Sequence, residues 1–167
     1  MDPVLRIIRE AELRDLEEYS CCFFPAQYDN LDVFLNSLNE SDRSTCLRAC
    51  LLFFRVTNGK VPRQFQLEST LAVMSGRDSV IIAGTGSGKT VCMMLPLLLD
   101  PGSISVVISP LKRLQMNQVR SMYFLRIQLT LHQVIEFENI GIRAISVNED
   151  TPKDRSFWKV STLAILA

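Results

Sequence analysis

Residues 79–90 read SVIIAGTGSGKT, an apolar run followed by a glycine-rich turn and a Lys-Thr pair. Glycines at alternate positions let the backbone turn its N–H groups inward, because no Cβ obstructs them, and such a turn forms a nest for an anion. A helix that begins at Lys89 would point its positive end at the same place. Lys89 would bring a mobile cation to the β and γ phosphates, and the Thr90 hydroxyl could ligate Mg²⁺. The stretch therefore predicts a buried strand over residues 79–83, a phosphate-binding loop and a helix over residues 89–99.

The alternative is a glycine-rich turn that binds nothing. The strict phosphate-loop pattern G-x-x-x-x-G-K-[ST] has glycine at its first position, where this chain has Ala83. The expected strand, the loop, the Lys-Thr pair and the expected helix nevertheless follow one another in the required order, which favours phosphate binding.

Composition excludes several classes of protein. The 167 residues are 47% hydrophobic, enough for the core of one ordinary domain with a small appendage. The 18 basic residues balance the 18 acidic ones, which argues against a general polyanion-coating protein but permits a local basic patch. The apolar runs are too short to span a bilayer, and the alternating charges of the first residues fit no secretory signal. We expect an intracellular protein that does not act at a membrane.

The five cysteines suggest free thiols in a reducing compartment, because their number is odd. Cys46 and Cys50 are four residues apart in a helical pattern, and Cys21 and Cys22 are adjacent. A zinc site of four thiolates is conceivable, but the usual C-x-x-C pairs are absent. Small buried hydrophobic side chains are the favoured interpretation.

The first part of the chain predicts a small helical appendage. Apolar residues recur there at helical spacing, and the charged residues between them form a solvated face. The expected helices cover residues 2–19, 31–38 and 47–54, the last begun by Ser41 or Asp42. A turn at residues 57–62 contains two helix breakers, so we place a module boundary there and assign residues 1–57 to the appendage.

After this turn, helix and strand signals alternate. The expected elements are a helix over residues 65–75, the strand over 79–83, the helix over 89–99, a strand over 105–109, a helix after Pro110 and a third strand over 143–147. Strands that alternate with helices imply a parallel sheet covered on both faces. The predicted fold class is therefore α/β.

Two segments resemble those that bind ATP in a known family. Residues 83–90, AGTGSGKT, are similar to motif I of superfamily-two helicases, which begins with Ala where other phosphate loops have Gly. Residues 62–78, PRQFQLESTLAVMSGRD, resemble the adenine-reading segment of DEAD-box and RecQ helicases, and Gln66 lies 23 residues before Lys89, as in that family. The amide of Gln66 offers the donor and the acceptor that adenine requires. Arg63 would lie near the base. A surface glutamine on an ordinary helix is the alternative for Gln66.

A third segment points to the RecQ type. Residues 109–118, SPLKRLQMNQ, resemble its motif Ia, S-P-L-x-x-L-x-x-[DN]-Q, where a DEAD-box protein would have P-T-R-E-L. In the family this segment holds the backbone of a single strand. The residues implied in nucleic-acid binding are Ser109, Pro110, Leu111, Lys112 and Gln118. A plain strand–helix turn capped by Ser109 is the alternative.

The resemblance implies a partial RecA-like P-loop lobe with a parallel sheet, preceded by the all-helical appendage. It implies ATP and Mg²⁺ as cofactors, single-stranded nucleic acid as a partner with DNA favoured, and a nuclear location. Lys89 and Thr90 would be the catalytic residues, and Thr90 would ligate Mg²⁺. The implied ATP-binding residues are Arg63, Gln66, Gly84, Thr85, Gly86, Ser87, Gly88, Lys89 and Thr90.

The family pattern is broken twice. Residues 119–133 look like an insert within the lobe assigned to residues 58–159, because their removal restores the family's spacing between Gln118 and the segment that begins at Gly141. They could be a translated intron, an extended helix or a family-specific loop. Residues 160–167 look like a tail outside the family, and the codons for Val160 and Ser161 could match a splice donor.

The acidic D-E-x-H segment that helicases place on a later strand does not occur in the 167 residues. The pair Glu149-Asp150 falls where the family has an exposed turn, so it is not accepted as a substitute. We therefore expect a lobe truncated before that motif, which binds ATP weakly with little or no turnover. Two other functions stay open: an adapter that binds a partner through the helical appendage, and a P-loop kinase of small molecules. Such a kinase would need a lid of arginines that the sequence does not show.

Overall fold

The computed structural model describes residues 3–24, 29–108, 135, 137–140, 142, 144–147 and 163–166. The chain divides into two compact units, Met1–Asp100 and Pro101–Ala167, and each is described by itself. The module boundary expected after residue 57 stays a prediction.

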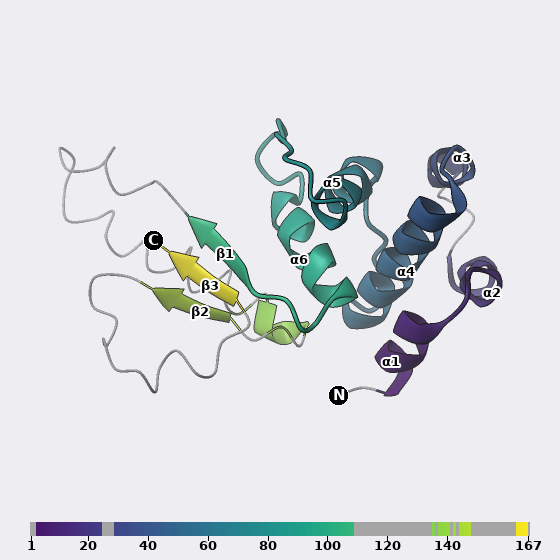
Figure 1. The fold of residues 1–167 in the computed structure, drawn as a ribbon, viewed down its shortest axis with the longest axis horizontal. Coiled ribbons are helices and arrows are strands. Elements are labelled where there is room, and N and C mark those ends of the chain that lie inside the picture. Colours follow the sequence, from purple (N-terminus) through teal and green to yellow (C-terminus); the bar gives the residue numbers. More distant parts are fainter. Residues whose placement is uncertain are drawn as a thin grey trace. The chain divides into compact units, whose positions relative to one another are not determined.

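The first unit consists of helices (Figure 1). In chain order they are α1 Pro3–Glu10, α2 Leu13–Phe23, α3 Asp29–Asn36, α4 Glu40–Val56, α5 Gln64–Met74 and α6 Lys89–Leu99. The predicted helices over residues 65–75 and 89–99 are confirmed by α5 and α6. In the part of the chain that the structure describes, no helix combines the length and the apolar character needed to cross a bilayer.

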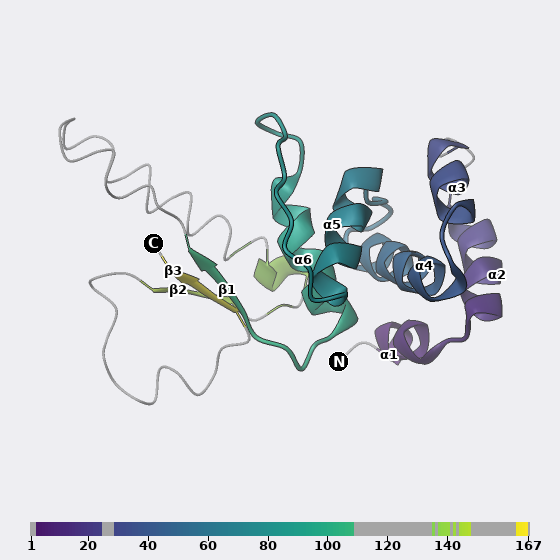
Figure 2. The same ribbon diagram turned by 45° about the horizontal axis from the view of Figure 1, so that its top comes forward.

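Helix α4 lies at the centre of this unit and contacts each of the other five helices (Figure 2). Its start is encoded locally: the side chain of Asn39 accepts a hydrogen bond of 2.9 Å from the N–H of Asp42, and Glu40 and Asp42 place negative charge in the first turn. The cap is therefore Asn39 rather than the expected Ser41 or Asp42. Helix α4 contributes more buried side chains to the core than any other helix described; they are Cys46, Leu47, Ala49, Cys50, Leu51, Leu52 and Phe53.

The single helix predicted over residues 2–19 is wrong, because the chain breaks between α1 and α2. Glu12 has an extended backbone, with φ −75° and ψ 164°. The carbonyl oxygen of Ala11, which a continuous helix would bond internally, accepts a hydrogen bond of 2.9 Å from Nη2 of Arg48 on α4. A tertiary contact thus provides the hydrogen bond that the carbonyl group of Ala11 lacks at the break.

The cysteines divide by burial. Cys46, Cys50 and Cys92 are buried, as expected, whereas Cys21 and Cys22 are exposed, contrary to expectation. Burial, together with the charge of Asp42, raises the pKa of Cys46 to about 12, and burial also raises the pKa of Cys50. Both thiols are therefore neutral near pH 7 and act as packing groups.

The predicted α/β fold class is wrong for the described chain, which is mostly helical. The strand expected over residues 79–83, which should have carried the glycine-rich loop, is not formed. Val80 is 89% and Ile82 is 96% exposed, so neither has the cover that a buried strand would provide. A strand is completed only by pairing with a neighbour, and no described strand pairs with this segment. The loop therefore belongs to a helical unit.

The strands of the second unit are short: β1 Ser105–Ile108, β2 Ala144–Val147 and β3 Leu163–Leu166. They pair in parallel in the order β1-β3-β2, with Val106 opposite Ala164 and Ile145 opposite the same residue. None of them adjoins the glycine-rich loop in the sequence. The central strand β3 comes from the residues that the sequence analysis assigned to a tail, whose relation to the family stays a prediction.

Candidate nucleotide-binding site

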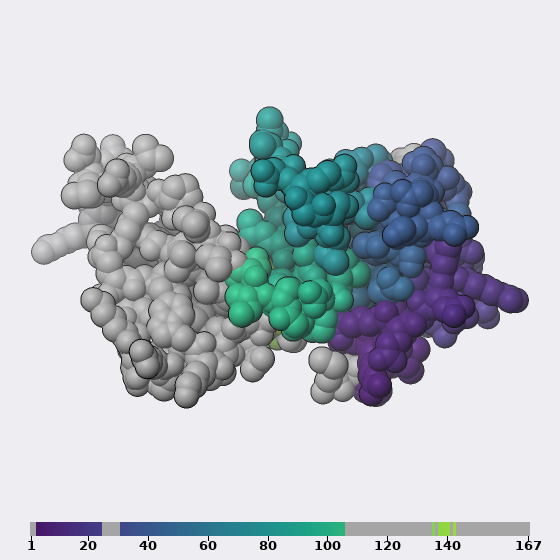
Figure 3. Space-filling view, in the orientation of Figure 1, coloured from purple at the N-terminus to yellow at the C-terminus, as the bar shows by residue number. Residues whose placement is uncertain are grey.

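The segment between α5 and α6 ends in the glycine-rich loop, and this segment forms the teal protrusion in Figure 3. Gly86 has φ 79° and Gly88 has φ 86°, so both occupy the left-handed region that favours glycine. Gly84 does not, and a Cβ added there would meet nothing within 4 Å. Two of the three glycines are thus required by the backbone of the loop.

Gln66 ties the loop to the start of α5. Its Oε1 accepts a hydrogen bond of 2.8 Å from the N–H of Arg63, and its Nε2 donates one of 2.9 Å to the carbonyl oxygen of Gly88. Gln66 is only 4% exposed, so the alternative interpretation, a surface glutamine on an ordinary helix, is excluded. A Cβ on Gly88 would lie 2.7 Å from Nε2 of Gln66. Gly88 is therefore required both by its backbone angle and by the approach of Gln66.

Lys89 folds back on the loop. Its Nζ donates hydrogen bonds of 2.8 Å to the carbonyl oxygen of Ala83 and 2.9 Å to that of Gly84. The residue is exposed, so solvent and solutes can reach its ammonium group. These contacts hold the cation over the loop, in the region where the sequence predicts bound phosphate.

The N-terminal ends of α5 and α6 converge, since Gln66 lies in the first turn of α5 and Gly88 caps α6. Neither helix has an acidic residue in its first turn that would neutralise the positive helix end. The first N–H groups of a helix have no partner within it. The combination of two positive helix ends and one lysine favours an anion at this place.

A buried polar stripe on α5, which the sequence analysis missed, supports this arrangement. It consists of Gln66, Ser69 and Thr70. Thr70 donates a hydrogen bond of 2.8 Å from Oγ1 to the carbonyl oxygen of Gln66, and Ser69 lies near the thiol of Cys92 on α6. The spacing of Gln66, Ser69 and Thr70, three and four residues apart, is the signal that they share one helix face.

The appendage supports α6 from its other end. Nε of Arg9 on α1 donates a hydrogen bond of 2.9 Å to the carbonyl oxygen of Leu98, in the last turn of α6. Partial burial lowers the pKa of Arg9, but a guanidinium remains charged at neutral pH. Positive charge at a helix C-terminus is stabilising, so Arg9 of α1 stabilises α6, the helix that follows the glycine-rich loop.

All nine predicted ATP-binding residues lie in the described chain, on the loop and at the starts of α5 and α6. Arg63 is exposed and precedes α5, and Oγ of Ser87 is buried without a hydrogen-bond partner among the described residues. The predicted nucleic-acid-binding residues Ser109, Pro110, Leu111, Lys112 and Gln118 lie outside the described residues.

The residues present fit a nucleotide with its metal. The left-handed glycines leave room for an anion, and the unpartnered hydroxyl of Ser87 offers a donor within the loop. Thr90, at the second position of α6, is the one hydroxyl assigned to Mg²⁺, which commonly takes its other ligands from phosphate and water. Within the described segments, no group of three or more His, Cys, Asp and Glu residues could hold a metal ion.

A left-handed glycine that caps a helix, followed by a lysine, is the arrangement of a phosphate-loop protein. The family model for the DEAD/DEAH box helicase matches residues 63–157. The chain belongs to this family.

Several curated relatives are named as RecQ-type or Q-type DNA helicases, which confirms the resemblance stated from the motifs. The chain is 36% identical over 129 residues to ATP-dependent DNA helicase Q5 of Mus musculus, covering 75% of this chain and 13% of that protein. It is 36% identical over 94 residues to ATP-dependent DNA helicase Q-like 2 of Arabidopsis thaliana, covering 54% and 13%. It is 41% identical over 68 residues to RecQ-like DNA helicase BLM of Xenopus laevis, covering 41% and 5%. The chain thus spans a small part of the length of each relative.

Proposed function

We propose that this chain binds ATP with Mg²⁺ on the loop between α5 and α6, as part of the machinery of a RecQ-like DNA helicase. The observation that carries the proposal is the hydrogen bond from Gln66 to Gly88, since it joins the predicted adenine-reading segment to the predicted phosphate loop. These two segments are 22 residues apart in the sequence at this contact. Their union at the positive ends of two helices supports a site for one ligand with a base and phosphates.

Lys89 would exchange its two carbonyl partners for phosphate oxygens when the nucleotide binds. A phosphate oxygen carries a full negative charge and a carbonyl oxygen only a partial one, so the ammonium group is attracted more strongly to phosphate than to the carbonyls of Ala83 and Gly84. The bound Mg²⁺ would neutralise phosphate charge, and Thr90 would hold it. Gln66 would keep its existing bonds, because its amide has one further N–H and one further lone pair for adenine.

The nucleic-acid part of the proposal rests on the resemblance of residues 109–118 to RecQ motif Ia and on the names of the relatives. We propose that the partner is single-stranded DNA and that the protein acts in the nucleus. The hydroxyl of Ser109 and the charge of Lys112 would contact the phosphate backbone, which carries no sequence information. Binding would therefore be sequence-tolerant.

Replacing Lys89 by alanine is expected to remove most ATP affinity. The phosphates lose a charge-assisted donor worth about 1.5–3 kcal/mol, which corresponds to roughly a tenfold to hundredfold rise in Kd. Calorimetric titration with ATP and Mg²⁺ measures the change, with Lys60→Ala, at an exposed lysine in the turn before α5, as the matched control. Equal Kd values for the two variants would place the phosphates elsewhere.

Replacing Gln66 by alanine is expected to weaken ATP more than GTP. Both nucleotides lose the support that Gln66 gives to Gly88, whereas only ATP loses the contact with its base. Titration of both nucleotides against the wild type and the variant separates the two contributions. An equal loss for ATP and GTP would leave Gln66 as a support of the loop and refute its adenine role.

Binding of single-stranded DNA is expected to fall by about 0.7 log units per phosphate contact for each tenfold rise in salt. The double variant Ser109→Ala, Lys112→Ala should flatten this slope, because it removes a phosphate contact. Fluorescence anisotropy of a labelled oligothymidine across a salt series gives the slope, and Lys60→Ala is again the control. An unchanged slope in the double variant would place the strand on other residues.

A further inference from the structure

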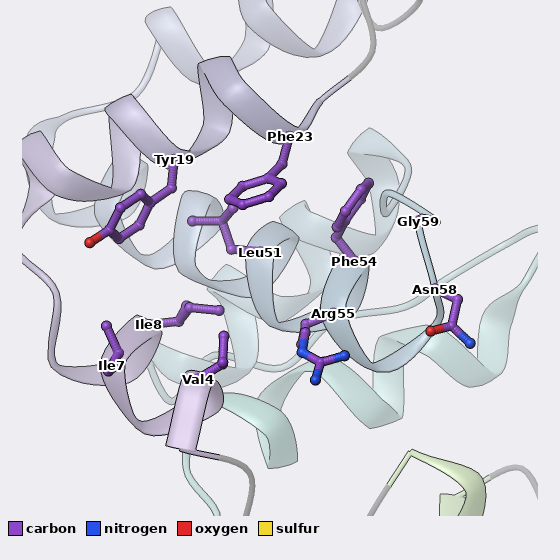
Figure 4. A pocket seen from close by; sticks show the side chains of 10 residues that line it. All are labelled: Val4, Ile7, Ile8, Tyr19, Phe23, Leu51, Phe54, Arg55, Asn58 and Gly59. Carbon is purple, nitrogen blue, oxygen red and sulfur yellow. The ribbon is translucent and has the colours of Figure 1, made fainter.

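The helices of the appendage enclose a pocket of about 510 Å³. Side chains from α1, α2 and α4 line it, together with the turn at Asn58 and Gly59 (Figure 4). Its volume falls within the range of about 300–1,000 Å³ that is typical of small-molecule sites. None of the residues assigned to ATP lines it, so this pocket is separate from the nucleotide site.

The walls of the pocket are apolar. Val4, Ile7 and Ile8 line it from α1, and the aromatic rings of Tyr19, Phe23 and Phe54 line it from α2 and α4. The rings of Phe23 and Phe54 lie 6.2 Å apart between centroids and are tilted by 45°. Flat apolar rings fit between such walls by stacking and by edge-to-face contact.

The pocket is not a closed packing defect of the core. Ile7 is 56%, Phe23 is 55% and Val4 is 41% exposed, so apolar surface at its rim faces solvent. Leu51 is 3% exposed and forms part of the pocket's lining from the core of the unit. An occupant would therefore cover exposed apolar area against a wall that is already packed, which is favourable at about 25 cal/mol per Å².

The charge of the lining selects the occupant. Among the described residues that line the pocket, Arg55 is the charged one and none carries a carboxylate. In Figure 4 Arg55 and Asn58 lie toward one side and Tyr19 toward the other. A guanidinium has five N–H donors in a fixed fork that matches an acidic group, so Arg55 can bind one in addition to a partner it already has.

We propose that this pocket binds an amphipathic organic anion, a small molecule with an aromatic body and a single acidic group. The body would lie between the rings and the aliphatic side chains of α1, and the acid would bond to Arg55. A concave site of this volume, enclosed by three helices, suits a compact ligand, whereas an extended partner helix would need a longer groove.

The test uses two probes and the full chain. The probes are 1-anilinonaphthalene-8-sulfonate and its neutral parent, N-phenyl-1-naphthylamine, which share one aromatic body and differ in the acidic group. Both should bind with one-to-one stoichiometry and enhanced fluorescence. Arg55→Gln should raise the Kd of the sulfonate about tenfold or more and change that of the neutral parent less than twofold. Retained binding of the neutral parent also shows that this variant is folded.

Three further variants separate the pocket from other apolar or charged surface. Ile7→Trp should block both probes, because the larger side chain at the exposed wall fills the space. Ile82→Ser changes an apolar side chain that is 96% exposed and lies outside the pocket, so it should leave both Kd values unchanged. Arg77→Gln removes the charge of an exposed arginine outside the pocket and should also leave both Kd values unchanged. Equal losses of both probes in Arg55→Gln would overturn the proposal. So would loss of binding in Ile82→Ser, or sedimentation showing that a second copy of the chain covers the pocket and excludes the probes.

Discussion

The purified 167-residue chain is expected to bind ATP without hydrolysing it, whether or not single-stranded DNA is present. Phosphoryl transfer needs a carboxylate that organises Mg²⁺, a group that positions the attacking water, and an arginine that stabilises the transferring phosphoryl. The sequence contains no D-E-x-H segment to supply the first two. The arginine alone is worth about a thousandfold or more in rate. A nucleotide that is merely held by Lys89 and the loop therefore keeps most of its barrier to hydrolysis.

The measurement is release of labelled phosphate from ATP with Mg²⁺, with and without single-stranded DNA. Lys89→Ala is the control for contaminating hydrolase, since only turnover at the loop depends on Lys89. The wild type and this variant should release phosphate at the same low rate. DNA-stimulated turnover that Lys89→Ala abolishes would contradict the expectation. Variants Glu149→Gln and Asp150→Asn would then show whether that acidic pair organises the metal.

Gly88→Ala is expected to destabilise the first unit by about 2–5 kcal/mol. A left-handed backbone costs about 1–2 kcal/mol for a residue with a Cβ, and a buried hydrogen-bonding group that loses its partner costs about 1–3 kcal/mol. Gly88 has φ 86°, and its added Cβ would lie 2.7 Å from Nε2 of Gln66. Relief of the clash by movement of Gln66 would break the hydrogen bond that joins α5 to the loop. ATP affinity should fall together with stability.

Urea unfolding followed by circular dichroism gives the free energy of unfolding. Gly84→Ala is the matched control, because its backbone needs no left-handed angle and its Cβ would meet nothing within 4 Å. It should remain within about 1 kcal/mol of the wild type. In the double variant Gly88→Ala, Gln66→Ala the two losses should not add, because Gln66→Ala by itself already removes the hydrogen bond that Gly88→Ala breaks. A Gly88→Ala protein as stable as Gly84→Ala would refute the close approach of Gln66.

The helices of the candidate site could be predicted because their signals are local. Helix α6 was predicted over residues 89–99 and spans Lys89–Leu99, since a glycine turn precedes it and the pair Pro101-Gly102 follows it. Helix α5 was predicted within one residue at each end. The spacing between Gln66 and Lys89 marked Gln66 as a site residue, but the partners of its amide could not be read from spacing.

The strand over residues 79–83 could not be decided in the same way. Its apolar run has the composition of a buried strand, but a strand needs a neighbour that local sequence does not specify. In the structure Val80 and Ile82 are almost fully exposed, and the loop is held by helices instead. The break between α1 and α2 was missed for a related reason, because Arg48 satisfies the carbonyl of Ala11 from 37 residues away.

The sequence by itself determined the glycine-rich loop, the lysine at the start of α6 and membership of the helicase family, because these depend on residue types at short, defined spacings. Only the tertiary structure decided what holds the loop. It placed the amide of Gln66 between the N–H of Arg63 and the carbonyl of Gly88, and it placed Arg9 at the far end of α6. Such contacts join residues that are distant in the chain, and which distant groups meet is set by how the helices pack around α4.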